Sequence, residues 1–103
     1  MANLTQEAWK NQLESDNNAV IIDVRTDGEV AEGYISGAMH IDIYQGQGFI
    51  YKLEELDKSK NYYVYCRSGA RSEKACEIMN QLGIANAYNL LGGILQWQGD
   101  IIH

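Results

Sequence analysis

Short apolar runs rich in β-branched and aromatic residues mark the expected strands of this chain. Residues 19–24 are almost continuously apolar, which is typical of a strand covered on both faces in a parallel sheet. Residues 62–65 form an aromatic and β-branched run, and shorter strands are expected over 39–43 and around 87–90.

Apolar residues at helical spacing fill the segments between these strands. Thr5 is placed to cap a first helix that ends near Glu14, and Gly83 is a plausible stop for a later helix that follows the loop 67–70. The expected apolar faces are Leu4, Ala8, Trp9 and Leu13, then Phe49, Leu53 and Leu56, then Ala75, Ile78, Met79 and Leu82. Short helical pieces are expected at 27–32 and from Gly92 to about Gln98, a loop at 45–48, and core positions for Leu95 and Trp97.

The alternation of strands and helices predicts an α/β fold with a mostly parallel sheet. No repeat, linker or low-complexity segment interrupts the pattern, so residues 1–103 are expected to form one domain. In sheets of this class, ligands bind beyond the carboxyl ends of the strands. Asp23 and Cys66 are both expected at that edge.

Charge and composition limit the classes of partner that this chain is expected to bind. The hydrophobic share of 46% and the charged share of 21% are ordinary for a globular protein, while a formal net charge of -6 argues against nucleic acid and anionic membranes as partners. No segment resembles a signal peptide or a membrane span, and two cysteines cannot form a disulfide framework. We therefore expect a cytoplasmic protein with free thiols, in which an anionic substrate needs a local basic site.

The loop after the strand at 62–65 carries the clearest chemical signal. Cys66 opens a segment whose backbone N–H groups can converge on the sulfur, as in an anion-binding nest, just before a helix begins. Helix dipole, amides and the guanidinium groups of Arg67 and Arg71 all favour a thiolate, which is the nucleophilic form. Gly69 allows close approach of the backbone, and Ser68 is a candidate either to donate a hydrogen bond to the sulfur or to cap the helix.

Several motifs in this chain resemble those of the rhodanese family. The segment 64–72 is similar to the active-site segment of single-domain rhodaneses, and 89–97 is similar to their closing Leu-x-Gly-Gly-x-x-x-Trp segment. Upstream, 22–25, Glu29 and 33–38 resemble the family's Asp-Val-Arg, Glu and Gly-His-Ile-Pro-Gly-Ala elements. The departures are Tyr34 in place of His and Ser36 in place of Pro, both outside the cysteine loop.

The resemblance implies a three-layer domain with helices on both faces of the sheet, and a sulfurtransferase activity. Cys66 would take a sulfane sulfur from an anionic donor such as thiosulfate, as a persulfide, and pass it to cyanide in vitro or to thiols, including a protein acceptor, in the cell. The substrate-binding residues implied by the loop are Arg67, Ser68, Gly69, Ala70 and Arg71. Neither a cofactor nor a metal is implied.

Other reactive residue types in the chain have simpler interpretations. Asp23 and Arg25 are expected to form a structural ion pair that supports the site, and Cys76 to pack on the apolar stripe of its helix. His40 has no second metal ligand at a suitable spacing, so we do not expect a zinc site. We further expect Arg67 to face the mouth of the cleft and recruit the donor, and Arg71 to be held by a carboxylate such as Glu29 or Asp23.

Two alternative functions remain open at this point. Phosphatases of the same fold also use a cysteine in a loop that ends in arginine, but their loop is one residue longer than the six residues from Cys66 to Arg71. Rhodanese-like domains that lack the cysteine act as interaction modules, whereas this chain has Cys66. Turnover of thiosulfate and cyanide against turnover of an aryl phosphate would discriminate among the three.

Overall fold

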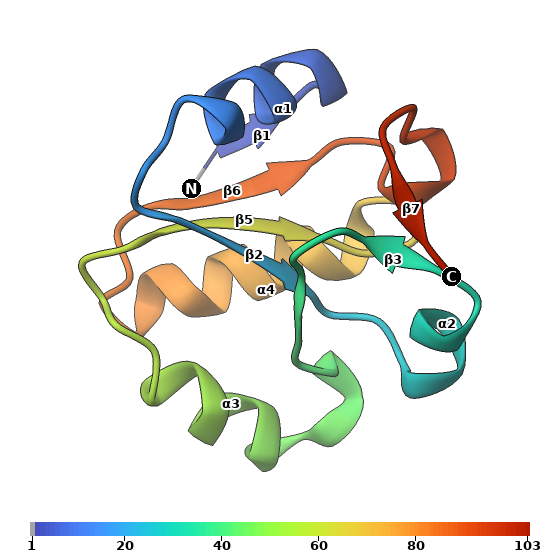
Figure 1. Ribbon diagram of the computed structural model, residues 1–103. Coiled ribbons are helices and arrows are strands. Elements are labelled where there is room, and N and C mark those ends of the chain that lie inside the picture. Colours follow the sequence, from blue (N-terminus) through green and yellow to red (C-terminus); the bar gives the residue numbers. More distant parts are fainter. Residues whose placement is uncertain (1) are drawn as a thin grey trace.

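A parallel five-stranded sheet organises the computed structural model, which describes residues 2–103 (Figure 1). The strand order is β1-β6-β5-β2-β4, and every neighbouring pair in this sheet runs parallel. A second, two-stranded antiparallel sheet pairs β3 with β7. The strands are β1 (Ala2–Leu4), β2 (Ala19–Asp23), β3 (Tyr34–Ile35), β4 (Met39–His40), β5 (Asn61–Tyr65), β6 (Ala87–Leu90) and β7 (Ile101–Ile102).

Helices cover both faces of the central sheet, as the resemblance implies. Figure 1 shows α1 on one side of the sheet and α3 and α4 on the other, with α2 beside the carboxyl edge. The α-helices are α1 (Gln6–Glu14), α2 (Asp27–Ala31), α3 (Gln47–Glu54) and α4 (Ala70–Gln81), and single 3₁₀ turns span Ile43–Gln45 and Ile94–Gln96.

The alternation of side chains along β5 divides the core into two clusters. Tyr62 and Val64 face α3 and α4, where they pack with residues such as Leu53 and Met79. Tyr63 and Tyr65 face the opposite side and pack around Trp9 of α1. The indole of Trp9 meets the rings of Tyr63 and Tyr65 edge to face, at centroid separations of 5.7 and 6.4 Å.

Several of the expected elements differ in detail from those in the structure. The expected strand at 39–43 stops at His40, because Asp42 accepts a hydrogen bond from the Tyr44 amide at 2.8 Å and caps a 3₁₀ turn. Helix α3 already begins within the expected loop 45–48, and the expected helix after Gly93 is a single 3₁₀ turn.

Three of the expected core and helix-face positions also need correction. Leu95 is 59% exposed, so its assignment to the core is wrong, whereas Trp97 packs half-buried against the Trp9 cluster. Leu4 lies in β1 rather than on α1, and Ala8 is exposed on that helix. Among residues 2–103, no helix is both long enough and apolar enough to cross a membrane.

Candidate functional site

The loop from Cys66 to Arg71 lies between the carboxyl end of β5 and the start of α4. Gly69 adopts φ +108°, a conformation that residues with a side chain rarely adopt, and it occupies the N-cap position of α4. The loop backbone is held from outside by the segment after β6, because the amides of Ile94 and Leu95 donate to the carbonyls of Cys66 and Arg67 at 3.0 and 3.1 Å. A β-carbon on Gly93 would collide with those carbonyls, which explains the glycine there.

Hydrogen-bond donors converge on the sulfur of Cys66, and the residue as a whole is 1% exposed. The amide of Gly69 lies 3.1 Å from Sγ and the hydroxyl of Ser72 lies 3.3 Å from it. Burial raises the pKa of the Cys66 thiol, but hydrogen bonds from the Ser72 hydroxyl and from the amides of Ser72, Gly69 and Ser68 outweigh burial and leave the pKa below its ordinary value. The cradle therefore favours the thiolate.

Ser72, and not Ser68, supplies a hydroxyl to the sulfur, so neither role considered for Ser68 is seen. The side chain of Ser68 is exposed, and α4 has Gly69 at its N-cap with no side-chain cap, so the expectation that Ser68 caps the helix is wrong. Ser72 is buried in the first turn of α4, where side chains point back toward the helix N-terminus and hence toward the loop. A serine three residues after the loop glycine was the signal in the sequence that could have identified it.

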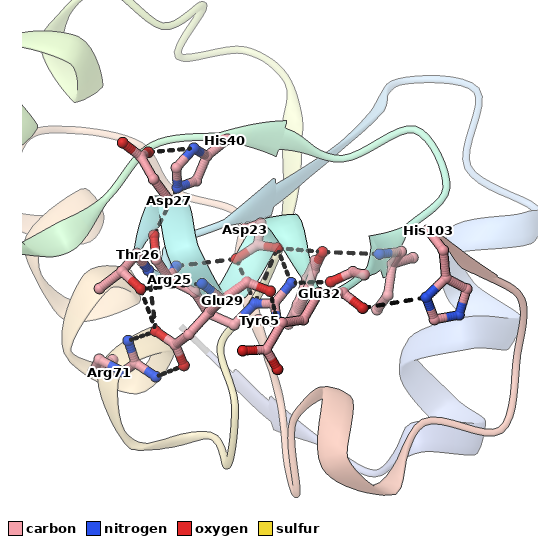
Figure 2. Close-up of polar contacts among 12 residues, drawn as sticks. Asp23, Arg25, Thr26, Asp27, Glu29, Glu32, His40, Tyr65, Arg71 and His103 are labelled. Atoms are coloured by element: carbon pink, nitrogen blue, oxygen red, sulfur yellow. Dashed lines mark hydrogen bonds and ion pairs between the residues drawn. The ribbon is translucent and has the colours of Figure 1, made fainter.

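Arg71 is anchored by Glu29 of α2 (Figure 2). The two guanidinium nitrogens lie 2.7 and 2.8 Å from the two carboxylate oxygens, and the guanidinium also stacks over the Tyr44 ring at 5.6 Å. The hydrogen bond from Arg71 is the largest cause of the lowered pKa of Glu29, which is about 2; burial opposes it, and hydrogen bonds from the Thr26 amide and hydroxyl lower the pKa further. Of the two carboxylates expected to hold Arg71, the structure pairs it with Glu29.

Asp23 and Arg25 form a buried ion pair at the ends of the strands, as expected (Figure 2). Arg25 Nη2 lies 2.7 Å from Asp23 Oδ2, and the same nitrogen donates to the Gly33 carbonyl at 2.7 Å. The Tyr65 hydroxyl donates to Asp23 at 2.6 Å and accepts from the Ile35 amide at 3.0 Å. Burial, followed by the hydrogen bond to Asp23, raises the pKa of Tyr65. These contacts join α2 and β3 to the main sheet beside the loop.

Arg67 is exposed and lines a cavity of about 340 Å³ that also contains Glu29 and Leu95 in its wall. A second cavity of about 530 Å³ has a mostly apolar wall that includes Phe49 and Ile50, and Arg71 also lines it. The ion pair thus contributes one residue to the wall of each cavity, Glu29 to the first and Arg71 to the second.

The remaining candidates lie apart from this cradle. Burial raises the pKa of Cys76 to about 12, in keeping with a packing role in the core. His40 Nε2 lies 2.6 Å from the Arg25 carbonyl and its Nδ1 lies 3.5 Å from Asp27. Within residues 2–103, no group of three or more His, Cys, Asp or Glu side chains is arranged to hold a metal ion.

Comparison with known proteins places this chain in a family. The sequence model of the family described as the rhodanese-like domain matches residues 5–100. The putative sulfurtransferase YtwF of Bacillus subtilis is 40% identical over 100 residues, which cover 94% of this chain and 90% of YtwF. A tRNA uridine(34) hydroxylase of Synechocystis is 38% identical over 97 residues, 91% of this chain but 34% of the hydroxylase.

A solved structure agrees with this assignment. The rhodanese-like domain protein from Staphylococcus aureus is 37% identical and superposes with a TM-score of 0.81, covering 97% of this chain and 93% of that one. The family match, the relative and the solved structure all point to the same family, and this chain belongs to the rhodanese-like domain family.

Proposed function

We propose that this protein is a sulfurtransferase in which Cys66 carries a sulfane sulfur as a persulfide. The observation that carries the proposal is the cradle itself, in which an amide at 3.1 Å and a hydroxyl at 3.3 Å point at a buried sulfur whose pKa is lowered. A thiolate held in this way is a nucleophile at neutral pH, and the same donors stabilise the anionic outer sulfur of a persulfide. The similarity to a putative sulfurtransferase over nearly the whole chain supports this assignment.

The reaction with thiosulfate balances without a proton or a cofactor. The Cys66 thiolate attacks the outer sulfur of thiosulfate, the sulfur–sulfur bond of the donor breaks, and sulfite leaves with its electron pair. The product is a persulfide anion on Cys66. A thiophilic acceptor, cyanide in vitro or a thiol of a small molecule or a protein in the cell, then attacks the outer sulfur and restores the Cys66 thiolate.

The loop residues divide these tasks between them. The backbone of Ser68, Gly69 and Ala70 shapes the cradle, and the Ser68 and Gly69 amides contribute donors to the sulfur. Arg67, exposed at the rim of the cavity of about 340 Å³, attracts the anionic donor. Arg71 holds the loop through its ion pair with Glu29. Asp23 and Arg25 support the site by joining the neighbouring loops.

The phosphatase alternative is disfavoured by the position of Arg71. A phosphatase loop needs its arginine to bind the phosphoryl oxygens, but here two guanidinium nitrogens are occupied by the Glu29 carboxylate. The six-residue loop is also one residue shorter than in the phosphatases.

Steady-state kinetics test the proposal. We expect the purified protein to form thiocyanate from thiosulfate and cyanide, Cys66→Ser to abolish this activity, and Cys76→Ser to retain it. Hydrolysis of an aryl phosphate at a comparable rate would instead favour a phosphatase. Absence of both activities in a folded protein would favour an interaction module.

A further inference from the structure

A line of buried polar side chains connects the Cys66 sulfur to the surface at the edge of the sheet. Asn89 of β6 is 1% exposed, and its Oδ1 lies within short hydrogen-bonding distance of the Ser72 hydroxyl. Its Nδ2 donates to Asn3 Oδ1 at 2.9 Å and to the Gly69 carbonyl at 3.1 Å. Asn3 in turn donates to the Glu73 carboxylate at 2.9 Å.

The orientation of the Asn89 amide is fixed by the groups around it. The Gly69 carbonyl can only accept a hydrogen bond, so the nitrogen of the Asn89 amide must face it and the oxygen must face Ser72. The Asn3 amide is oriented in the same way by the Glu73 carboxylate, which is also only an acceptor when ionised. Asn89 Oδ1 therefore takes its hydrogen bond from the Ser72 hydroxyl.

Ser72 has one hydroxyl proton, and three acceptors surround it. These are Asn89 Oδ1, the Cys66 sulfur at 3.3 Å and the Gly69 carbonyl at 3.2 Å. The Gly69 carbonyl has another donor in the Glu73 amide, so the competition for the proton is between Asn89 and Cys66. When Cys66 is a neutral thiol, its own S–H can donate to Ser72 while Ser72 donates to Asn89. When the sulfur is anionic, it can accept the Ser72 proton, but a hydrogen bond from Ser72 to the sulfur leaves the buried amide oxygen of Asn89 without a donor.

We propose that Asn89 is a positioning residue that competes with the Cys66 sulfur for the proton of Ser72, and thereby sets how readily the sulfur ionises and how reactive it is. Asn89 does not touch the substrate in this account and acts only through Ser72. Its effect opposes that of the backbone donors, since it makes the anionic sulfur less stable. A more basic thiolate is a stronger nucleophile, so this opposition preserves reactivity toward the sulfur donor.

The other charged and titratable groups on the elements packed against the loop are left in place by changes at Asn89. They are Asp23, Arg25, Asp27, Glu29, Asp42, Tyr44, Tyr62, Tyr63, Tyr65, Arg67, Arg71, Glu73, Lys74, Cys76, Glu77 and Tyr88. Of these, Arg71 and Cys76 interact electrostatically with Cys66. A shift in the titration of Cys66 that depends on the Ser72 hydroxyl can therefore be separated from their effects.

The test measures the rate of alkylation of Cys66 by iodoacetamide against pH, resolved from Cys76 by peptide mass. Asn89→Leu should lower the pKa of Cys66 by about one unit, because Ser72 then donates to the sulfur without competition. The limiting alkylation rate at high pH should fall about threefold, since nucleophilicity falls with basicity. Ser72→Ala should raise the pKa by about one unit.

The double variant Ser72→Ala/Asn89→Leu distinguishes this role from a merely structural one. It should titrate like Ser72→Ala alone, because Asn89 acts only through the hydroxyl. Asn3→Ala is the matched control, since it removes the outer partner of Asn89 and should leave the Cys66 titration unchanged. A shift from Asn89→Leu that persists without the Ser72 hydroxyl, an upward shift, or no shift in folded protein would overturn the proposal.

A measurement on the unmodified protein keeps the proposal testable if Asn89→Leu does not fold. The carbonyl carbon resonance of the Asn89 side chain should titrate together with Cys66, while that of Asn3 should not. An Asn89 resonance that is insensitive to ionisation of Cys66 would contradict the proposal. The consequence for catalysis rests on the sulfurtransferase function proposed above, but neither assay uses a sulfur donor. A protein that passes both and transfers no sulfur would overturn only the proposed function.

Discussion

The ion pair between Glu29 and Arg71 allows a quantitative prediction about the stability of the loop. The pKa of Glu29 falls from 4.5 to about 2, with the hydrogen bond from Arg71 as the largest cause. At about 1.4 kcal/mol per pKa unit, that change corresponds to roughly 3 kcal/mol. The two side chains remain 25% and 21% exposed, so solvent screening reduces the contribution to about 1–2 kcal/mol.

We therefore expect Glu29→Gln to lower the free energy of unfolding by about 1–2 kcal/mol at pH 7, which corresponds to a fall in Tm of roughly 5–10 °C for a domain of this size. Because the pKa of Glu29 is lower in the folded protein than in the unfolded chain, the contribution is complete above about pH 5 and is lost as the pH falls toward 2. The difference between the two proteins should shrink over that range.

Urea denaturation from pH 7 down to pH 3 measures this difference. Glu77→Gln is the matched control, because Glu77 pairs with Lys74 on the same helix at 3.8 Å with side chains that are 48% and 67% exposed, and its loss should have little effect. The kcat for sulfur transfer should also fall in Glu29→Gln, since Arg71 loses its anchor. A Glu29→Gln protein as stable as the parent at pH 7, or a difference that does not depend on pH, would refute the reasoning.

Further changes test the rest of the loop. Arg67→Ala should raise the KM for thiosulfate about fivefold with little change in kcat or Tm, an effect of about 1 kcal/mol that shrinks with added salt; a loss of Tm instead would give Arg67 a structural role. Gly93→Ala should lower both Tm and activity because its β-carbon collides with the loop carbonyls, whereas Gly28→Ala, with open space around it, should not; equal melting of the two would contradict this packing. Insertion of one glycine before Arg71 should abolish sulfur transfer by spreading the amides around Cys66, as measured by thiocyanate formation, and retained turnover would show that loop size is not critical.

The longer strands and the cysteine loop could be predicted because local patterns specify them. The run at 19–24 is almost continuously apolar, and the strand that leads into Cys66 is mostly aromatic, so both patterns favour a buried strand. The ion pair of Asp23 and Arg25 could be predicted as well, because both residues lie at the carboxyl end of a strand in a parallel sheet.

Short strands and exposed apolar residues could not be predicted in the same way. β3 and β7 have two residues each and exist through pairing between distant segments, which leaves no periodicity to detect. Leu95 has the apolar character of a core residue, but a 3₁₀ turn in place of the expected helix directs it to solvent.

The roles of Ser72 and Asn89 were missed for a related reason. Ser68 is the candidate hydroxyl donor in the sequence, and only the start of α4 at Ala70 decides that Ser72 turns back toward Cys66. Asn89 lies in a strand that reads as apolar, and its importance depends on the pairing of β6 beside β5.

The central claim is that Cys66 takes up a transferable sulfur, and intact mass spectrometry tests it most directly. After incubation with thiosulfate and removal of excess donor, the protein should gain the mass of one sulfur atom, about 32 Da, on the peptide that contains Cys66, and cyanide should remove it. Cys76→Ser should gain the same mass. No gain in mass with thiosulfate or with other sulfane sulfur donors, or a gain that maps to Cys76, would contradict the account.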